Sequence, residues 1–101
     1  MLRIIDGKSY NTKTARHLCE LDSVAYRSDF AYHRTSLYQT KKGALFLAGH
    51  GGPLSMWAKS TGNGTTGGEG VLVVDSDEAR SILETENKIE VLQELFHIEE
   101  A

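Results

Sequence analysis

Two strand-like runs joined by a short Lys-Lys-Gly turn constrain the fold of this chain more than any other feature. Residues 30–40 and residues 44–48 are rich in aromatic and β-favouring side chains. Residues 41–43 supply the short, glycine-containing connection that is typical of a β-hairpin. We expect antiparallel pairing across this turn, with Phe30 and Tyr32 on one face and cross-strand contacts between aromatic side chains. The centre of the chain therefore predicts an antiparallel sheet.

Shorter β-rich runs precede and follow this hairpin. Residues 2–5 lead into an Asp6-Gly7 turn dipeptide, which predicts a small hairpin ending near Tyr10. The alternation of side chains over residues 16–22 favours a strand, although the same stretch also fits a short helix. The apolar run over residues 71–74 predicts a buried strand.

Glycine-rich stretches separate these runs. We expect residues 49–53 to end the second strand of the central hairpin, residues 54–59 to form one helical turn, and residues 61–70, five of them glycine, to form a loop. Backbone N–H groups in such loops could face a phosphate. Neither glycine-rich stretch is followed by Gly-Lys-Ser/Thr or contains a dinucleotide-binding fingerprint, so we interpret the glycines as turn residues. Residues 23–29 are expected to be a polar connection.

Two short amphipathic helices are predicted at the C-terminal end of the chain. Asp75 followed by Glu78 fits a capping box, and Asn87 followed by Glu90 repeats the spacing for a second helix. Apolar residues recur at helical spacing in both segments. They are Ala79, Ile82 and Leu83 in the first helix, and Ile89, Leu92, Leu95 and Phe96 in the second.

The implied fold class is α+β: an antiparallel sheet with a central β-hairpin, covered by two C-terminal helices. A length of 101 residues suits a single domain over residues 1–101. No apolar run approaches the roughly 20 residues of a membrane span, and the first residues do not form a signal peptide. Cys19 is the only cysteine, so an intramolecular disulfide is impossible. These features predict a cytoplasmic protein.

Charge is distributed unevenly along the chain. The net charge is −3, but residues 1–60 hold nine Lys/Arg and four Asp/Glu, whereas residues 61–101 hold two Lys/Arg and ten Asp/Glu. The first segment therefore carries +5 and the second −8. Such an asymmetry is a hint about partners, although solvated helix surfaces are also often acidic.

Catalytic and metal-binding chemistry finds little support in the sequence. His17 and Cys19 are two residues apart and would point to one side of a strand, but no second close His/Cys pair completes a tetrahedral metal site. An enzyme using Cys19 or His50 would need an activating base or an oxyanion loop, and no such pattern is visible. We therefore predict a protein that is not an enzyme and has no cofactor and no metal.

The acidic side chains of the predicted helices form the first candidate binding surface. Acidic residues spaced four apart stand on one helix face, where they could engage a basic groove by resembling the charge of a nucleic-acid backbone. The candidate partner-binding residues are Asp77, Glu78, Glu84, Glu86, Glu90 and Glu94.

The basic tip of the central hairpin is the alternative binding surface. Lys41 and Lys42, with Arg34 and tyrosines nearby, could contact a nucleic acid. Solvated lysines are also common at hairpin tips. This surface suits a small nucleic-acid-binding accessory protein, but direct nucleic-acid binding is the weaker expectation because the chain is acidic overall.

Four segments resemble a family of small proteins of bacteria and mobile elements, most of them of uncharacterised function. The segments are residues 5–15 (IDGKSYNTKTA), 37–43 (LYQTKKG), 46–55 (FLAGHGGPLS) and 67–70 (GGEG), and the likeness extends over roughly residues 4–96. The family pattern often has an acidic residue at the place of His50 and does not require Cys19, which speaks against a reaction built on either side chain.

The resemblance implies a role on phages or mobile elements, where some small proteins inhibit host defence. It implies a non-enzymatic, anti-CRISPR-like inhibitor that binds a host defence protein through its acidic surface. A CRISPR surveillance complex is the expected partner, because such complexes hold nucleic acid in positively charged channels.

Overall fold

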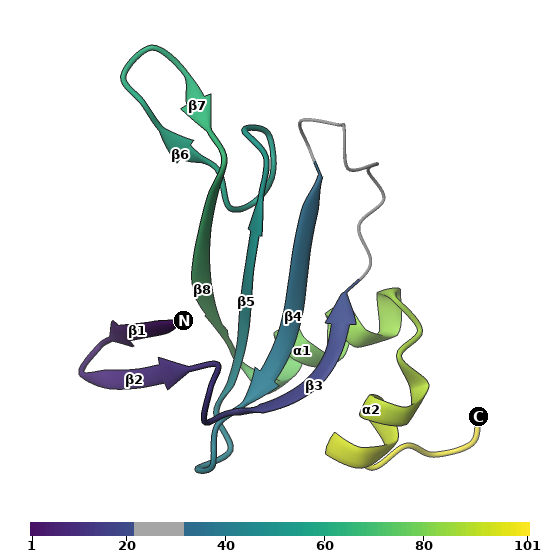
Figure 1. Cartoon of the computed structure of the whole chain (residues 1–101). Helices are drawn as coiled ribbons and strands as arrows, with labels where there is room; N and C mark the ends of the chain where they lie inside the picture. Colours follow the sequence, from purple (N-terminus) through teal and green to yellow (C-terminus); the bar gives the residue numbers. More distant parts are fainter. Residues whose placement is uncertain (22–31) are drawn as a thin grey trace.

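A four-stranded antiparallel sheet with the strand order β3-β4-β5-β8 forms the centre of the molecule (Figure 1). The computed structural model describes residues 1–21 and 32–101. The sheet strands are β3 (Arg16–Leu21), β4 (His33–Gln39), β5 (Leu45–Gly51) and β8 (Gly68–Val74). The remaining elements are the hairpin of β1 (Leu2–Ile5) and β2 (Lys8–Asn11), the hairpin of β6 (Lys59–Ser60) and β7 (Thr65–Thr66), and the helices α1 (Ser76–Thr85) and α2 (Ile89–Leu95).

This architecture confirms the predicted α+β class, with an antiparallel sheet followed by two C-terminal helices. The β1–β2 hairpin and the strand at the start of the sheet are confirmed as well. The polar connection expected over residues 23–29 lies outside the described residues. Among the described residues, no helix has the length and apolar character that crossing a membrane requires.

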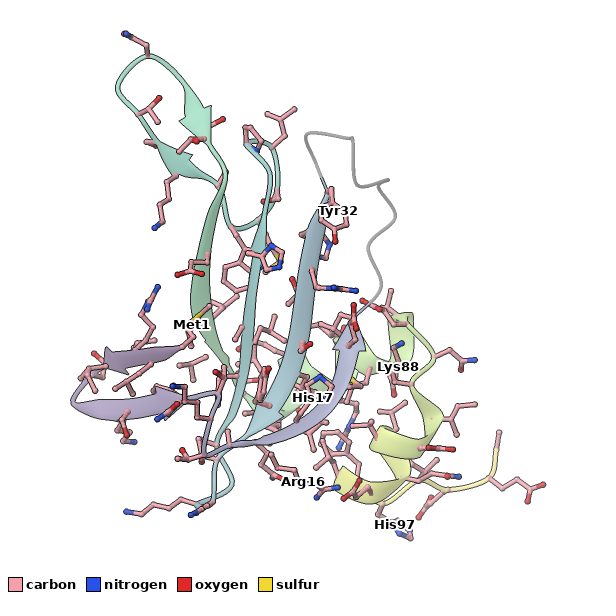
Figure 2. The ribbon with its side chains drawn as sticks, viewed as in Figure 1. Met1, Arg16, His17, Tyr32, Lys88 and His97 are labelled. Carbon is pink, nitrogen blue, oxygen red and sulfur yellow. The ribbon has the colours of Figure 1, made fainter. Side chains whose placement is uncertain are left out.

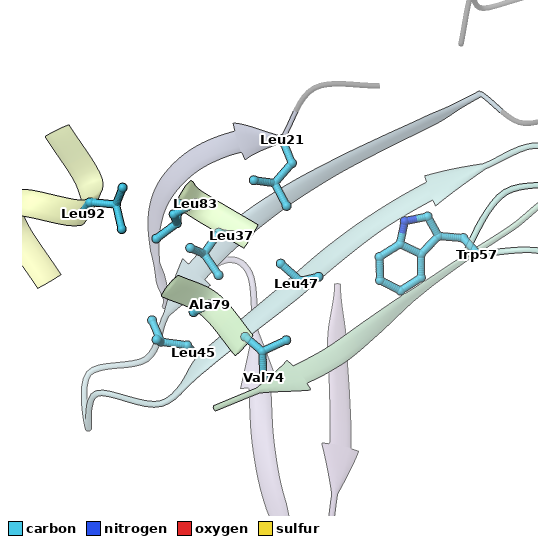
Figure 3. Packing of buried hydrophobic residues seen from close by; sticks show 9 residues of the cluster. All are labelled: Leu21, Leu37, Leu45, Leu47, Trp57, Val74, Ala79, Leu83 and Leu92. Atoms are coloured by element: carbon cyan, nitrogen blue, oxygen red, sulfur yellow. The ribbon is translucent and has the colours of Figure 1, made fainter. Parts of the chain in front are cut away.

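The two helices cover one face of the sheet. Side chains alternate along a strand, so every second residue of β4 and β5 points to the same face. On the helix side, Leu37 and Leu47 pack against Leu83 of α1 (Figure 3). The full buried cluster consists of Leu21, Leu37, Leu45, Leu47, Trp57, Val74, Ala79, Leu83 and Leu92.

An aromatic cluster fills the opposite face, beneath the β1–β2 hairpin. The ring of Tyr38 stacks on Phe46 across the β4–β5 pair, with centroids 5.3 Å apart and an interplanar angle of 12°. Tyr10 of β2 meets Phe46 edge-on at 5.5 Å. The predicted cross-strand aromatic contact is confirmed, but it is made by Tyr38. Tyr32 precedes β4, and Phe30 lies outside the described residues.

The start of α1 follows the predicted capping box. The Asp75 carboxylate accepts a hydrogen bond from the Glu78 backbone N–H at 2.8 Å, and the Glu78 carboxylate accepts one from the Asp75 N–H at 3.1 Å. These bonds satisfy two of the donors that a helix start leaves without partners. The cap fixes the point at which the chain leaves β8 and enters the helix.

The start of α2 differs from the prediction. Its N-cap is Lys88, which makes no side-chain capping bond, and Asn87 has a φ of 55°. Asn87 therefore turns the chain after α1 in the left-handed region that asparagine tolerates, rather than capping α2. Leu92 is buried as expected, but Ile89 is 53% exposed. Ile89 is the first residue of the seven-residue helix α2 and lies at the edge of its contact with the rest of the chain.

The glycine-rich stretches contain strand residues where a strand end and a loop were expected. β5 continues to Gly51, and residues 61–70 contain the turn of the β6–β7 hairpin and the start of β8. Residues 52–53 and 61–64 lie outside the strands as expected, but the predictions were wrong for residues 49–51, 65–66 and 68–70, where strand pairing overrides the local preference of glycine for turns. Residues 53–57 form hydrogen-bonded turns and no helix. β8 is an edge strand that buries only Val74, so the expectation of a buried strand was too strong.

Candidate functional site

The six predicted partner-binding acids all lie on or between the two helices, but their side chains are engaged to different degrees. Glu78 is held in the capping box of α1. Glu94 of α2 forms an ion pair with Arg16 at the start of β3 (Figure 2). Glu86 is the C-cap of α1 and is half-buried. Three of the six side chains are therefore partly engaged within the chain.

The other three acids are exposed to solvent. Asp77 and Glu84 are two turns apart on the side of α1 that faces away from the buried Ala79 and Leu83, and Glu90 lies in the first turn of α2. In the part of the chain that the structure describes, these three carboxylates form no ion pair. We call Asp77, Glu84 and Glu90 the acidic face.

The basic residues of the alternative surface do not lie together. Arg34 is near the start of β4, whereas Lys41 and Lys42 lie in the turn that follows its end (Figure 1). At 3.3 Å per residue, the strand between them is about 20 Å long. Arg34 also donates to the Glu20 carboxylate at 3.0 Å. The structure therefore separates Arg34 from the two lysines and neutralises its charge locally.

Lys41 and Lys42 are brought together with Lys8 instead. A groove of about 580 Å³ lies between the β1–β2 hairpin and the β4–β5 turn. We call it the lysine groove. Its ten lining residues include no acid. The polar residues that line it include Lys8, Ser9, Thr14, Thr40, Lys41 and Lys42.

Cys19 and His17 point to opposite faces of the sheet, which contradicts the expectation that they share one side. The register between β3 and β4 shifts between His17 and Cys19, so that His17 pairs with Tyr38 and Cys19 with Leu37. This β-bulge adds one residue and reverses the alternation. The His17 ring meets the Tyr38 ring edge-on at 5.3 Å, whereas Cys19 packs against the helix-side core.

His50 lies on the face of the sheet that carries the β1–β2 hairpin, whereas Cys19 lies on the face covered by the helices. It is exposed, and in the strand register it stands between Arg34 and Glu69. No group of three or more His, Cys, Asp or Glu side chains that could hold a metal occurs within residues 1–21 and 32–101. The structure therefore does not bring the two candidate catalytic residues into one site.

A buried hydrogen-bond network lies on the helix-side face of the sheet, near the start of β4 and away from the β4–β5 turn. The Trp57 indole N–H donates to the Thr35 hydroxyl at 2.8 Å, and Thr35 Oγ1 lies 2.9 Å from His33 Nδ1. Thr35 is 1% exposed and Trp57 is 8% exposed. Sequence reasoning did not single out this network, since only the strand register shows that Thr35 points inward. Its members have one another as partners, which indicates a structural role.

Comparisons with known proteins add no assignment. No protein-family model, curated protein or solved structure matches the chain. The family resemblance of the four motif segments therefore stays a prediction, and functional inference depends on the two charged surfaces.

Proposed function

We propose that this protein is a non-enzymatic inhibitor of a host defence system, of the anti-CRISPR type, in the cytoplasm of a bacterial host. It binds a defence protein or complex through the acidic face of α1 and α2. A CRISPR surveillance complex is the proposed partner, because its channel for nucleic acid is positively charged.

The observation that carries this proposal is the exposure of Asp77, Glu84 and Glu90 without ion pairs among the described residues. A carboxylate that already has a partner in its own chain must exchange that partner on binding, whereas an exposed one exchanges only water. Complementary charge accelerates encounter and favours one orientation over others. The acidic face therefore offers the part of the negative charge that a basic channel can use directly.

The alternative of a nucleic-acid-binding accessory protein with Arg34, Lys41 and Lys42 on one surface is less well supported. The three side chains lie at opposite ends of β4, and Arg34 is paired with Glu20. A nucleic-acid strand bound at Lys41 and Lys42 would therefore not contact Arg34 with its adjacent phosphates.

The test is the plating efficiency of a phage on a host whose CRISPR system targets it, with and without this protein. We expect a large rise in plating on the targeting strain and none on a strain that lacks the system. No rise on any strain with a defined CRISPR system would contradict the proposed function.

A matched pair of variants tests the acidic face itself. Glu84→Lys with Glu90→Lys reverses two exposed charges on the helices, and Glu99→Lys with Glu100→Lys reverses two exposed charges after them. Both variants have the same net charge. We expect the first pair to abolish inhibition and the second to retain it. Full inhibition by the first pair would exclude the acidic face as the binding surface.

Asp77, Glu78, Glu86 and Glu94 are kept in these variants. Asp77 and Glu78 stand in the first turn of α1, where negative charge favours the helix, and Glu94 pairs with Arg16. Glu90 stands in the first turn of α2, so the unfolding midpoint must show whether its reversal costs stability. Equal thermal unfolding midpoints for the two variants provide the control.

A further inference from the structure

The lysines of the groove differ from three arginines of the neighbouring strands in how their charges are partnered. Three arginines each lie beside a carboxylate: Arg3 beside Glu69 at 3.9 Å, Arg34 beside Glu20 at 3.0 Å, and Arg16 beside Glu94. Within residues 1–21 and 32–101, the ammonium groups of Lys8, Lys41 and Lys42 form no ion pair and no side-chain hydrogen bond. The chain neutralises these arginines and leaves the groove lysines to solvent or a ligand.

Hydrogen bonds close the turn that carries Lys41 and Lys42. Thr40 N–H donates to the Ala44 carbonyl at 2.8 Å, Gly43 N–H to the Thr40 carbonyl at 2.9 Å, and Ala44 N–H to the Thr40 hydroxyl at 3.0 Å. Gly43 has a φ of 97°, which favours glycine at this position. The two lysines therefore project from a tight turn that is closed by hydrogen bonds between Thr40, Gly43 and Ala44.

The opposite wall of the groove is fixed as well. Lys8 begins β2, directly after the turn at Asp6 and Gly7, whose φ values are 51° and 75°. Tyr10 anchors this hairpin on the sheet, since its side chain is only 6% exposed and packs on Phe46. Two hydrogen-bonded hairpins thus bring three lysines to the lining of one groove.

We propose that the lysine groove binds phosphate groups, those of a nucleotide or of a nucleic-acid strand. Three ammonium groups suit an anion with more than one negative charge, and lysine binds phosphate well as a point charge. Ser9 and Thr14 line the same groove, and the Thr14 hydroxyl donates to the Asn11 carbonyl at 3.5 Å, so the lysines carry the recognition. A volume of about 580 Å³ lies within the range of small-molecule sites.

The groove recognises charge and not the base. Its one aromatic ring, Tyr10, is buried against Phe46, so it offers no face for base stacking. This site is separate from the acidic face of the helices, and the two proposals stand or fall independently.

The test is a titration of the intact protein at low salt with a fluorescent oligothymidylate, followed by competition with ATP and with inorganic phosphate. We expect oligothymidylate and oligoadenylate to bind alike. If three lysines neutralise phosphates of a single strand, the logarithm of the affinity falls against the logarithm of the salt concentration with a slope of about −2. Displacement by ATP at low concentration assigns the groove to a nucleotide, and binding that resists ATP assigns it to a strand.

Lys42→Glu and Lys59→Glu are the matched variants. Both residues are exposed and both substitutions change the net charge equally, but Lys59 lies in β6, outside the groove. We expect Lys42→Glu to weaken binding by about tenfold or more and Lys59→Glu to change it little. Equal effects of the two variants would overturn the proposal, and so would a failure of the unaltered protein to bind either oligonucleotide, ATP or inorganic phosphate.

Discussion

At the end of the sheet next to the β4–β5 turn, large side chains fill both faces, whereas at the other end glycines in β5 and β8 face a single tryptophan. Phe46 and Leu37 are 0% and 1% exposed at the turn end. At the glycine end, an added Cβ on Gly70 would lie 3.3 Å from the six-membered ring of Trp57. The sheet is therefore packed by interlocking side chains at one end, and at the other end by the Trp57 indole lying directly on glycine backbone.

This comparison assigns a structural purpose to residues that could have been taken for a ligand-binding motif. Gly49 and Gly51 of β5 pair with Gly70 and Gly68 of β8. The Trp57 ring fills the space beside Gly49 and Gly70, whereas Ser55 lies beside Gly51 and Lys59 beside Gly68. Packing thus explains the glycines of β5 and β8, but not Gly62 and Gly64, which have no neighbour within 4 Å of an added Cβ. The candidates for phosphate binding are therefore the lysines at the turn end of the sheet and not these glycines.

The largest expected effect is at the turn end. Phe46→Ala removes a fully buried ring that contacts both Tyr10 and Tyr38, and we expect it to lower the free energy of unfolding by about 3–5 kcal/mol. Urea unfolding measures the change. Phe46→Leu retains part of the contact and should remain folded if the alanine variant does not. A loss below about 1 kcal/mol for the alanine variant would contradict the interlocked packing of this end.

The next effect is at the glycine end. In Gly49→Ala the added methyl group would lie 2.8 Å from Trp57 Nε1 and 2.9 Å from Thr35 Cα, and it would overlap the Arg34 carbonyl oxygen. We expect a loss of about 1–3 kcal/mol in the free energy of unfolding, which is typical of overpacking. Gly64→Ala is the matched control, because nothing lies within 4 Å of its added methyl group. Equal unfolding midpoints for the two variants would show that the close approach at Gly49 is unimportant.

A smaller effect concerns the hydrogen bond that orients the indole. Thr35→Val preserves the shape of the side chain but removes the acceptor of the Trp57 N–H bond, leaving a buried donor without a partner. We expect a loss of about 1–2 kcal/mol and a shift in the emission of this single tryptophan. Thr35→Ser keeps the hydroxyl and should preserve the emission spectrum. An unchanged spectrum in the valine variant would argue against the bond.

The smallest effect concerns the helix that covers the turn end. Asp75→Ala removes the N-cap of α1 and should lower the free energy of unfolding by about 1 kcal/mol. Asp77→Ala removes an equal charge from the first turn without removing the capping bond, so its thermal unfolding midpoint should fall less. The reverse order of the two midpoints would contradict the capping box seen in the structure.

Local features of the fold were predictable, and features that depend on pairing partners were not. The Asp75–Glu78 cap and the β4–β5 hairpin follow from residues within a few positions of each other. The bulge between His17 and Cys19 depends on the register against β4, which the spacing of the two residues does not reveal. The strand at Gly49 was missed for the same reason, since its pairing with β8 outweighs its own low preference for strands.

The candidate site shows the same division. The acids of the helices could be placed on helix surfaces from sequence spacing, but the ion pair of Glu94 with Arg16 joins residues far apart in the chain. Lys8 was not a candidate, because it approaches Lys41 and Lys42 only when the β1–β2 hairpin packs on the sheet. Charge patterns in the sequence identified which residues are available, and tertiary packing decided which of them act together.

The position of β5 between β4 and β8 has a consequence for the order in which the sheet assembles. β4 and β5 are joined by residues 40–44, whereas β5 and β8 are separated by residues 52–67. Closing the longer connection costs about 1 kcal/mol more in chain entropy, so we expect β8 to join after the β4–β5 hairpin and to detach first. Amide hydrogens bonded between β5 and β8 should then exchange with solvent sooner than those between β4 and β5. The opposite order would contradict this sequence of events. α1 follows β8 directly in the chain and carries part of the acidic face. Early detachment of β8 would therefore also loosen α1.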